Sequence, residues 1–203
     1  MSFGRAVAGL MERVTAYRLW QAPFAEKKLE PLRRHNDLSK ASHVLDVGCG
    51  PGTNARHFAH ADYLGLDLNP AYVAYARRRY GDRFEVADVT RYTAPPSARF
   101  DFVLVNSLLH HVDTPNVRRV LAHLASLLTT DGHVHILDLV LPEKAGLPRL
   151  LARTDRGEHP RPLEQWRTLF TEAFEPVLFE PYSLGAFGVT LWSMVYFKGR
   201  RRS

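Results

Sequence analysis

The sequence is poor in cysteine and contains no long apolar run. Cys49 is the single cysteine among 203 residues, which excludes an internal disulfide and zinc sites built on paired cysteines and favours a reducing compartment. Arg5, Glu12 and Arg13 interrupt the apolar residues near the start of the chain, unlike a signal-peptide core. No segment approaches the ~20 consecutive apolar residues of a membrane-spanning helix. We therefore expect a cytoplasmic protein without a transmembrane segment.

Internal repeats, low-complexity segments and long linkers are also absent, and the length suits a single domain. Apolar residues make up 45% and charged residues 24%, as in ordinary globular proteins. The formal net charge of +6 would permit binding to nucleic acid or to an anionic surface. Much of this charge lies in the pair Arg33–Arg34, the run 77–79 and the C-terminal segment KGRRRS, so solvated basic faces account for it equally well.

Apolar strands alternate with helical patterns along the chain. Strands are predicted at residues 43–48, 62–67, 83–87, 100–106, 133–140, 174–181 and 189–197, and helices at 53–60, 70–80, 114–128 and 162–173. Asn69 and Thr114 are expected to cap two helices whose first turns contain Pro70 and Pro115. The short loop before residue 189 requires the last two strands to be antiparallel.

This order predicts an α/β, Rossmann-like, doubly wound fold. We expect a seven-stranded, mainly parallel sheet closed by a C-terminal antiparallel hairpin, within a single domain. Residues 1–35 are predicted to form an N-terminal helical segment that is a candidate lid, and residues 36–203 the sheet domain. The proline-rich stretch 141–162 is predicted to be irregular.

A glycine-rich loop follows the first predicted strand in the segment VLDVGCGPG. Gly48, Gly50 and Gly52 allow a tight turn and a close approach of a ligand to the main chain, at the strand ends where parallel sheets bind ligands. The spacing differs from the dinucleotide-binding fingerprint. Asp46 would also repel a pyrophosphate, whereas it would attract an ammonium group.

Two further acids follow the next two strands. Asp67 ends the second strand, where a carboxylate accepts hydrogen bonds from ribose hydroxyls. Asp88 follows the third strand, where it could accept a hydrogen bond from the exocyclic amine of adenine. An ammonium group, a ribose and an adenine together describe S-adenosylmethionine.

At these residues the sequence resembles the class I S-adenosylmethionine-dependent methyltransferases. VLDVGCGPG is similar to their first motif, LGLDLNP to the ribose-binding loop, VADVT to the adenine loop, FDFVLVNSLLHHV to the fourth-strand motif and LTTDGHVHILDLV to the fifth strand. The similarity runs from about Val44 to Val140. LLHHV most resembles the small-molecule branch, which includes methyltransferases of quinone biosynthesis and specialised metabolism. The NPPY-type signature of nucleic-acid amine methylation is absent.

The resemblance implies an S-adenosylmethionine-dependent methyltransferase (EC 2.1.1.-) domain over residues 36–203, with S-adenosylhomocysteine as product. The implied acceptor is a small molecule methylated at an O, N or C atom. An RNA methyltransferase and a non-catalytic partner protein that binds the cofactor are the alternatives. The expected cofactor-binding residues are Asp46, Gly48, Gly50, Gly52, Asn54, Asp67, Leu68, Asp88, Val89, Asn106 and Ser107.

Two histidines after the fourth strand are candidates for catalysis. Either His110 or His111 could deprotonate the acceptor as a general base, or one could pack while the other lines the cofactor. Neighbouring histidines on one short loop rarely converge on a single ion, so no metal is expected. The acceptor pocket is predicted to include Tyr17, Trp20, Phe24, Lys28, His111 and Asp138. The sequence does not indicate the oligomeric state.

Overall fold

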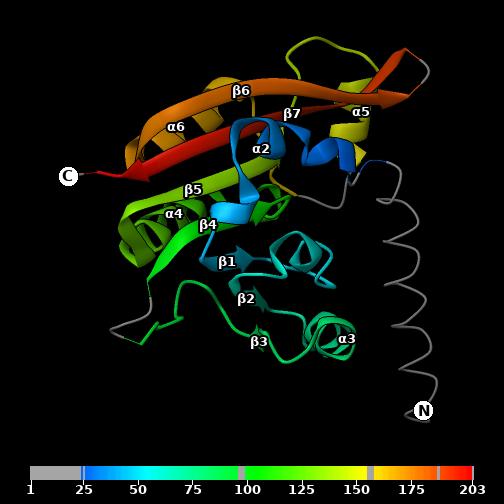
Figure 1. Cartoon of the computed structure of the whole chain (residues 1–203). Coiled ribbons are helices and arrows are strands. Elements are labelled where there is room, and N and C mark those ends of the chain that lie inside the picture. The colour runs from blue at the N-terminus through cyan, green and yellow to red at the C-terminus, as the bar shows by residue number, and fades with distance from the viewer. Residues whose placement is uncertain (1–23, 25, 96–98, 155–157, 187, 203) are drawn as a thin grey trace.

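The computed structural model describes residues 24, 26–95, 99–154, 158–186 and 188–202 (Figure 1). The predictions for Tyr17 and Trp20, and most of the predicted N-terminal helical segment, therefore lie outside the described residues. The strands are β1 (His43–Val47), β2 (Asp62–Asp67), β3 (Phe84–Val86), β4 (Phe100–Asn106), β5 (Leu128–Leu139), β6 (Phe174–Ala186) and β7 (Val189–Arg201).

These strands form one seven-stranded sheet in the order β3-β2-β1-β4-β5-β7-β6. The strands β3, β2, β1, β4 and β5 run parallel to one another. The strand β7 runs antiparallel to both β5 and β6. The predicted parallel sheet with a C-terminal antiparallel hairpin is confirmed. The chain moves outward from β1 to β3 and then returns to the other side of β1 as β4, so the strand order reverses between β1 and β4. Parallel sheets bind ligands at such a reversal.

Helices cover both faces of the sheet (Figure 1). On one face, α4 (Thr114–Leu127) and α6 (Leu163–Ala173) pack on a cluster that includes Val103 and Val105. On the other face, α3 (Pro70–Tyr80) and the residues around α2 (Glu30–His35) pack on a cluster that includes Leu104. Successive residues of a strand point to opposite faces, and here both sets are buried in apolar clusters. Both faces of β4 are therefore apolar.

Helix capping agrees with the sequence at one helix and differs at another. The Asn69 side chain accepts hydrogen bonds from the backbone of Ala71 and Tyr72, which confirms it as the cap of α3. The prediction of Thr114 as a cap is wrong. The Asp113 carboxylate caps α4 by accepting from Asn116 N at 2.9 Å, and a charged acceptor at that position stabilises the helix N-terminus.

Three predictions of secondary structure also need correction. Residues 53–60 do not form an α-helix but contain a 3₁₀ turn, η2 (Ala55–Phe58). The Asn54 side chain bonds inward to Asp46 and does not cap this turn. The stretch 141–162 contains α5 (Leu147–Thr154), whose Pro148 lies in the first turn, where proline is compatible with a helix. The strands β5, β6 and β7 are longer than predicted, because their backbone pairing continues beyond the apolar segments. No helix in the described part of the chain has the length and apolar character needed to cross a membrane.

Candidate functional site

The loop after β1 has a backbone shape that glycine favours. Gly50 has φ +54°, and a Cβ atom placed there would meet nothing within 4 Å, so its main chain faces open space. Gly48 has φ +67°, and a Cβ there would lie 2.9 Å from the Leu108 side chain. The loop is anchored to β2, because the backbone N–H groups of Gly48 and Cys49 both donate to Leu66 O. The positive φ thus disfavours a side chain at both glycines, and a ligand can reach the main chain at Gly50.

Asp67 joins the glycine loop to the end of β2. One carboxylate oxygen accepts a hydrogen bond from Gly50 N at 2.8 Å, and the other accepts from Asn69 N at 2.8 Å. Each carboxylate oxygen has a second lone pair, so the group retains capacity for further donors such as ribose hydroxyls. Leu68, the next residue, is 71% exposed and offers an apolar surface beside the acid.

Asp88 and Val89 follow β3 on the same side of the reversal point. Asp88 Oδ1 accepts from the side chain and the backbone N–H of Thr90 at 2.8 and 2.9 Å, and these bonds lower the pKa of the carboxyl group. Val89 is buried in the core cluster around β4. Asp88 is therefore held ionised after β3, while Val89 contributes to packing.

Asp46, near the end of β1, is fully buried beneath the glycine loop. Its Oδ2 atom accepts from the Tyr63 hydroxyl at 2.6 Å and from Asn54 Nδ2 at 3.1 Å. Its Oδ1 atom accepts no hydrogen bond from any described residue. Burial raises the pKa of Asp46 from 3.8 to about 6. A buried carboxylate oxygen without a donor is costly, and an ammonium group or a water would relieve that cost.

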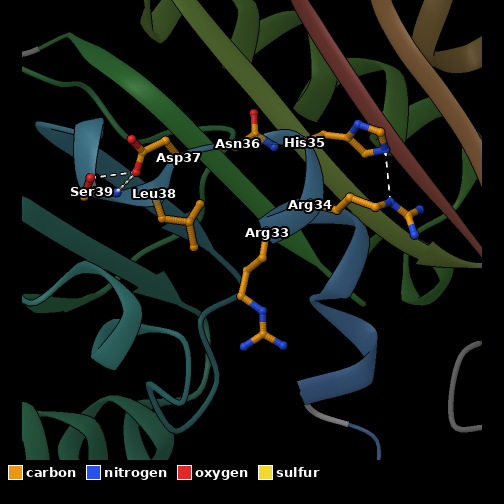
Figure 2. A pocket seen from close by; sticks show the side chains of 7 residues that line it. All are labelled: Arg33, Arg34, His35, Asn36, Asp37, Leu38 and Ser39. Atoms are coloured by element: carbon orange, nitrogen blue, oxygen red, sulfur yellow. Dashed lines mark hydrogen bonds between the residues drawn. The ribbon is translucent and has the colours of Figure 1, made fainter.

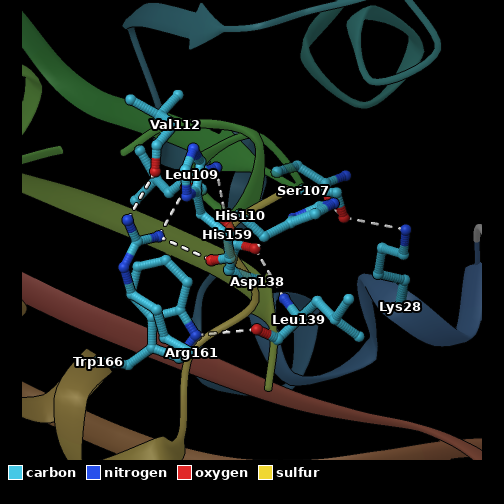
Figure 3. A network of polar contacts seen from close by, with 11 residues as sticks. Lys28, Ser107, Leu109, His110, Val112, Asp138, Leu139, His159, Arg161 and Trp166 are labelled. Atoms are coloured by element: carbon cyan, nitrogen blue, oxygen red, sulfur yellow. Dashed lines mark hydrogen bonds and ion pairs between the residues drawn. The ribbon is translucent and has the colours of Figure 1, made fainter. Parts of the chain in front are cut away.

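The end of β4 contains the other predicted cofactor residues, Asn106 and Ser107. Ser107 has φ +56°, a value that no other non-glycine residue in the described part of the chain approaches. Its hydroxyl accepts a hydrogen bond from Lys28 Nζ at 3.0 Å and donates to Asn106 Oδ1 at 3.2 Å (Figure 3). Strained backbone of this kind is concentrated at functional sites.

His110 and Asp138 form a buried pair in the same region (Figure 3). His110 Nδ1 lies 2.6 Å from Asp138 Oδ1, while Asp138 Oδ2 accepts from Leu109 N at 2.8 Å. Both oxygens of the fully buried Asp138 are thus engaged inside the protein, and its role in an acceptor pocket stays a prediction. The exposed His111 ring lies 4.1 Å from the His110 ring, centroid to centroid.

Arg161 holds the turn that contains both histidines, η3 (Leu109–His111). Its buried guanidinium donates to the carbonyl of Leu109 at 3.0 Å and to that of Val112 at 2.6 Å (Figure 3). It also lies 4.8 Å from the Trp166 ring centroid. Burial lowers the pKa of Arg161. Arg161 has no signature in the sequence, because its partners are backbone atoms about 50 residues away.

The remaining predicted pocket residues are Phe24 and Lys28. Lys28 is only 9% exposed and lies beside Ser107, whereas Phe24 is partly buried and packs near Leu139 on a small cluster away from the glycine loop. The structure thus brings Lys28, Ser107 and His110 into one region (Figure 3), and the His111 ring lies beside that of His110.

A separate hollow is lined by residues 33–39 (Figure 2). Arg34 and His35 contact Glu180, and Arg33 pairs with Glu26, so these side chains are engaged within the protein. Among the described residues, no group of three or more His, Cys, Asp or Glu side chains could hold a metal ion. The candidate site residues described above lie at the carboxyl ends of β1, β2 and β4 and after β3.

Comparison with known proteins agrees with this geometry. Residues 44–132 match the family described as "Methyltransferase domain". A trans-aconitate 2-methyltransferase of Delftia acidovorans is 31% identical over 145 residues, covering 64% of this chain and 54% of the relative. An uncharacterised methyltransferase of Mycobacterium tuberculosis is 34% identical over 105 residues, covering 49% of this chain and 51% of the relative. The chain thus spans about half the length of the curated relatives that it matches.

Solved structures resemble the whole sheet. The N-methyltransferase NodS from Bradyrhizobium japonicum, in complex with S-adenosylhomocysteine, superposes with a TM-score of 0.68 at 19% identity, covering 88% of this chain and 87% of NodS. Human N-acetylserotonin methyltransferase in complex with S-adenosylmethionine gives 0.71 at 15% identity, covering 97% of this chain and 57% of the human enzyme. At these identities the likeness concerns the fold. Together with the match of residues 44–132, which include the glycine loop and β4, it makes the chain similar in sequence and fold to methyltransferase domains that bind S-adenosylmethionine.

Proposed function

We propose that this protein transfers the methyl group of S-adenosylmethionine to a small-molecule acceptor. The observation that carries the proposal is the buried Asp46 oxygen without a donor, next to an open glycine main chain and the Asp67 carboxylate. In this assignment Asp46 attracts the cofactor ammonium, directly or through water. Asp67 accepts from the ribose hydroxyls, and Leu68 and Asp88 contact the adenine. Gly48, Gly52, Asn54 and Val89 shape and support this surface, and Asn106 and Ser107 border it at the end of β4.

When bound, the cofactor supplies an electrophilic methyl group, and the protein's task is to align the acceptor and exclude water. His110 is the better placed of the two candidate bases. Its Nδ1 atom is tied to Asp138, which selects the tautomer whose Nε2 atom can accept a proton from an acceptor. His111 is exposed and lines the approach to that region.

The acceptor class is proposed on the relatives. Several of the curated relatives are trans-aconitate 2-methyltransferases, which makes trans-aconitate the first acceptor to assay. None of the relatives named above is described as an RNA methyltransferase. A steep dependence of RNA affinity on salt would favour that alternative. A protein that binds the cofactor but methylates no acceptor would instead be the non-catalytic partner considered above.

Calorimetric titration of metal-stripped protein tests the cofactor assignment. We expect binding of S-adenosylmethionine and S-adenosylhomocysteine, and no comparable binding of NAD. Asp67→Ala should weaken both by tenfold or more, because a carboxylate that accepts ribose hydroxyls makes charge-assisted bonds of roughly 1.5–3 kcal/mol each. Asp62→Ala is the matched control, since Asp62 begins the same strand and is exposed. Tight NAD binding with no response to either sulfur nucleoside would contradict the proposal.

A further inference from the structure

The carboxyl edge of the sheet is divided into an acidic half and a basic half. Asp46, Asp67 and Asp88 lie at the ends of β1 and β2 and after β3. Around the end of β4 lie Lys28, Ser107, the two histidines and Arg161 (Figure 3). The acids Asp113 and Asp138 also lie on that side, but Asp113 caps α4 and Asp138 is bonded to His110. The acidic half suits the cationic groups of the cofactor, whereas the basic half suits an anion.

Lys28 is the side chain that best fits anion recognition in the basic half. It is 9% exposed, and its backbone is fixed because Lys28 O accepts a hydrogen bond from the Tyr182 hydroxyl at 2.9 Å. The adjacent Leu29 is buried in the core, so the segment is packed in place. Removing an ammonium group from water is costly, and a carboxylate is the group that offsets this cost best.

Ser107 directs this lysine toward the reaction edge. Its positive φ places its hydroxyl within 3.0 Å of Lys28 Nζ, and its own N–H donates to Leu137 O at 2.8 Å, which fixes the strained residue between β4 and β5. The ammonium group therefore lies at the strand-order reversal.

We propose that Lys28 is a carboxylate-binding residue at the methyl-transfer edge. This inference rests on the proposed function. The carboxylate has two sources, an acidic acceptor or the methionyl group of the cofactor. In the first case Lys28 selects acidic acceptors, and in the second it orients the cofactor.

The experiment compares Lys28→Met with Lys27→Met in the full-length chain. Lys27 is the exposed neighbour on the same segment and serves as the matched control. Calorimetry measures binding of S-adenosylhomocysteine and of its carboxamide, which lacks only the negative charge. A second titration, at saturating S-adenosylhomocysteine, measures binding of trans-aconitate and its neutral trimethyl ester.

A tenfold or greater loss of S-adenosylhomocysteine affinity in Lys28→Met, with carboxamide affinity unchanged, assigns the carboxylate to the cofactor. A similar loss for trans-aconitate, with S-adenosylhomocysteine affinity intact, assigns it to the acceptor. Lys28→Met values equal to those of wild type and Lys27→Met for every probe would overturn the proposal.

If Lys28→Met shows no cooperative thermal unfolding, it is not folded, and the titrations of the wild-type protein test the proposal instead. Equal wild-type affinities for S-adenosylhomocysteine and its carboxamide, together with no binding of trans-aconitate, would overturn the proposal. A wild-type preference for the charged member of either pair that disappears in Lys28→Gln supports it. Wild-type protein that binds neither S-adenosylhomocysteine nor the carboxamide would overturn the proposed function as well, so the two failures are distinguishable.

Discussion

Replacing Asp46 with asparagine should flatten part of the pH dependence of stability and weaken cofactor binding. Burial raises the pKa of Asp46 from 3.8 to about 6, so the folded protein binds this proton more tightly than the unfolded chain. The resulting stabilisation is fully present below pH ~4, and it is lost as the pH rises to about 6. A shift of about two pKa units corresponds to about 3 kcal/mol, at roughly 1.36 kcal/mol per unit.

Urea unfolding at pH 4, 5, 6 and 7.5 provides the assay. The amide side chain of Asp46→Asn cannot ionise. The free energy of unfolding of the variant minus that of the wild type should therefore increase by about 3 kcal/mol between pH 4 and pH 7. The absolute offset also includes the new amide N–H group, which lies where Oδ1 has no described partner. The pH-dependent difference is therefore the decisive quantity. Asp62→Asn, at an exposed position of β2, should show no such gain.

Cofactor binding supplies the second measurement on the same variant. If Asp46 attracts the cofactor ammonium, Asp46→Asn should lower the affinity for S-adenosylhomocysteine by tenfold or more at pH 7.5, although the apo variant has by then gained stability relative to wild type. A stability difference that does not vary with pH would refute the reasoning about burial. Unchanged affinity would refute the assignment of the ammonium to Asp46.

Two further predictions concern the surroundings of the site. Arg161→Met should destabilise the protein by roughly 2 kcal/mol or more, because the buried carbonyls of Leu109 and Val112 lose their donor. Urea unfolding would show this, and an effect no larger than that of the exposed Arg167→Met would contradict it. Because Leu29 and Leu32 are packed in the core, the proposed lid is confined to the residues before them, and deletion of residues 1–22 should abolish methyl transfer but preserve the cooperative unfolding of the sheet. Saturating S-adenosylhomocysteine should then slow proteolysis near Pro23, and equally fast cleavage with and without it would exclude a lid.

The sequence predicted best the elements whose signals are local. The strand at residues 100–106 matches β4 at both ends, because the apolar residues 102–105 are flanked by polar residues. The helix that begins at Pro70 matches α3, because a cap and a proline mark its start. The helix α5 was not predicted, since its short sequence contains a proline that also suits a loop.

The site was predictable as a set of residues but not as a set of contacts. The acids after the strands could be located because parallel strands end at one edge. The pair of His110 with Asp138 could not, because 28 residues separate them and only the register of β4 against β5 brings them together. That register pairs Asn106 with Leu137, so knowledge of it would have placed Asp138 next to the turn after β4.

The hydrogen bond from Gly50 to Asp67 has a consequence for how a ligand would enter. The glycine loop takes its shape from the protein's own contacts with β2, and the acid that would receive the ribose also fixes that loop. The surface is therefore preorganised, and ligand binding does not carry the entropic cost of ordering the main chain.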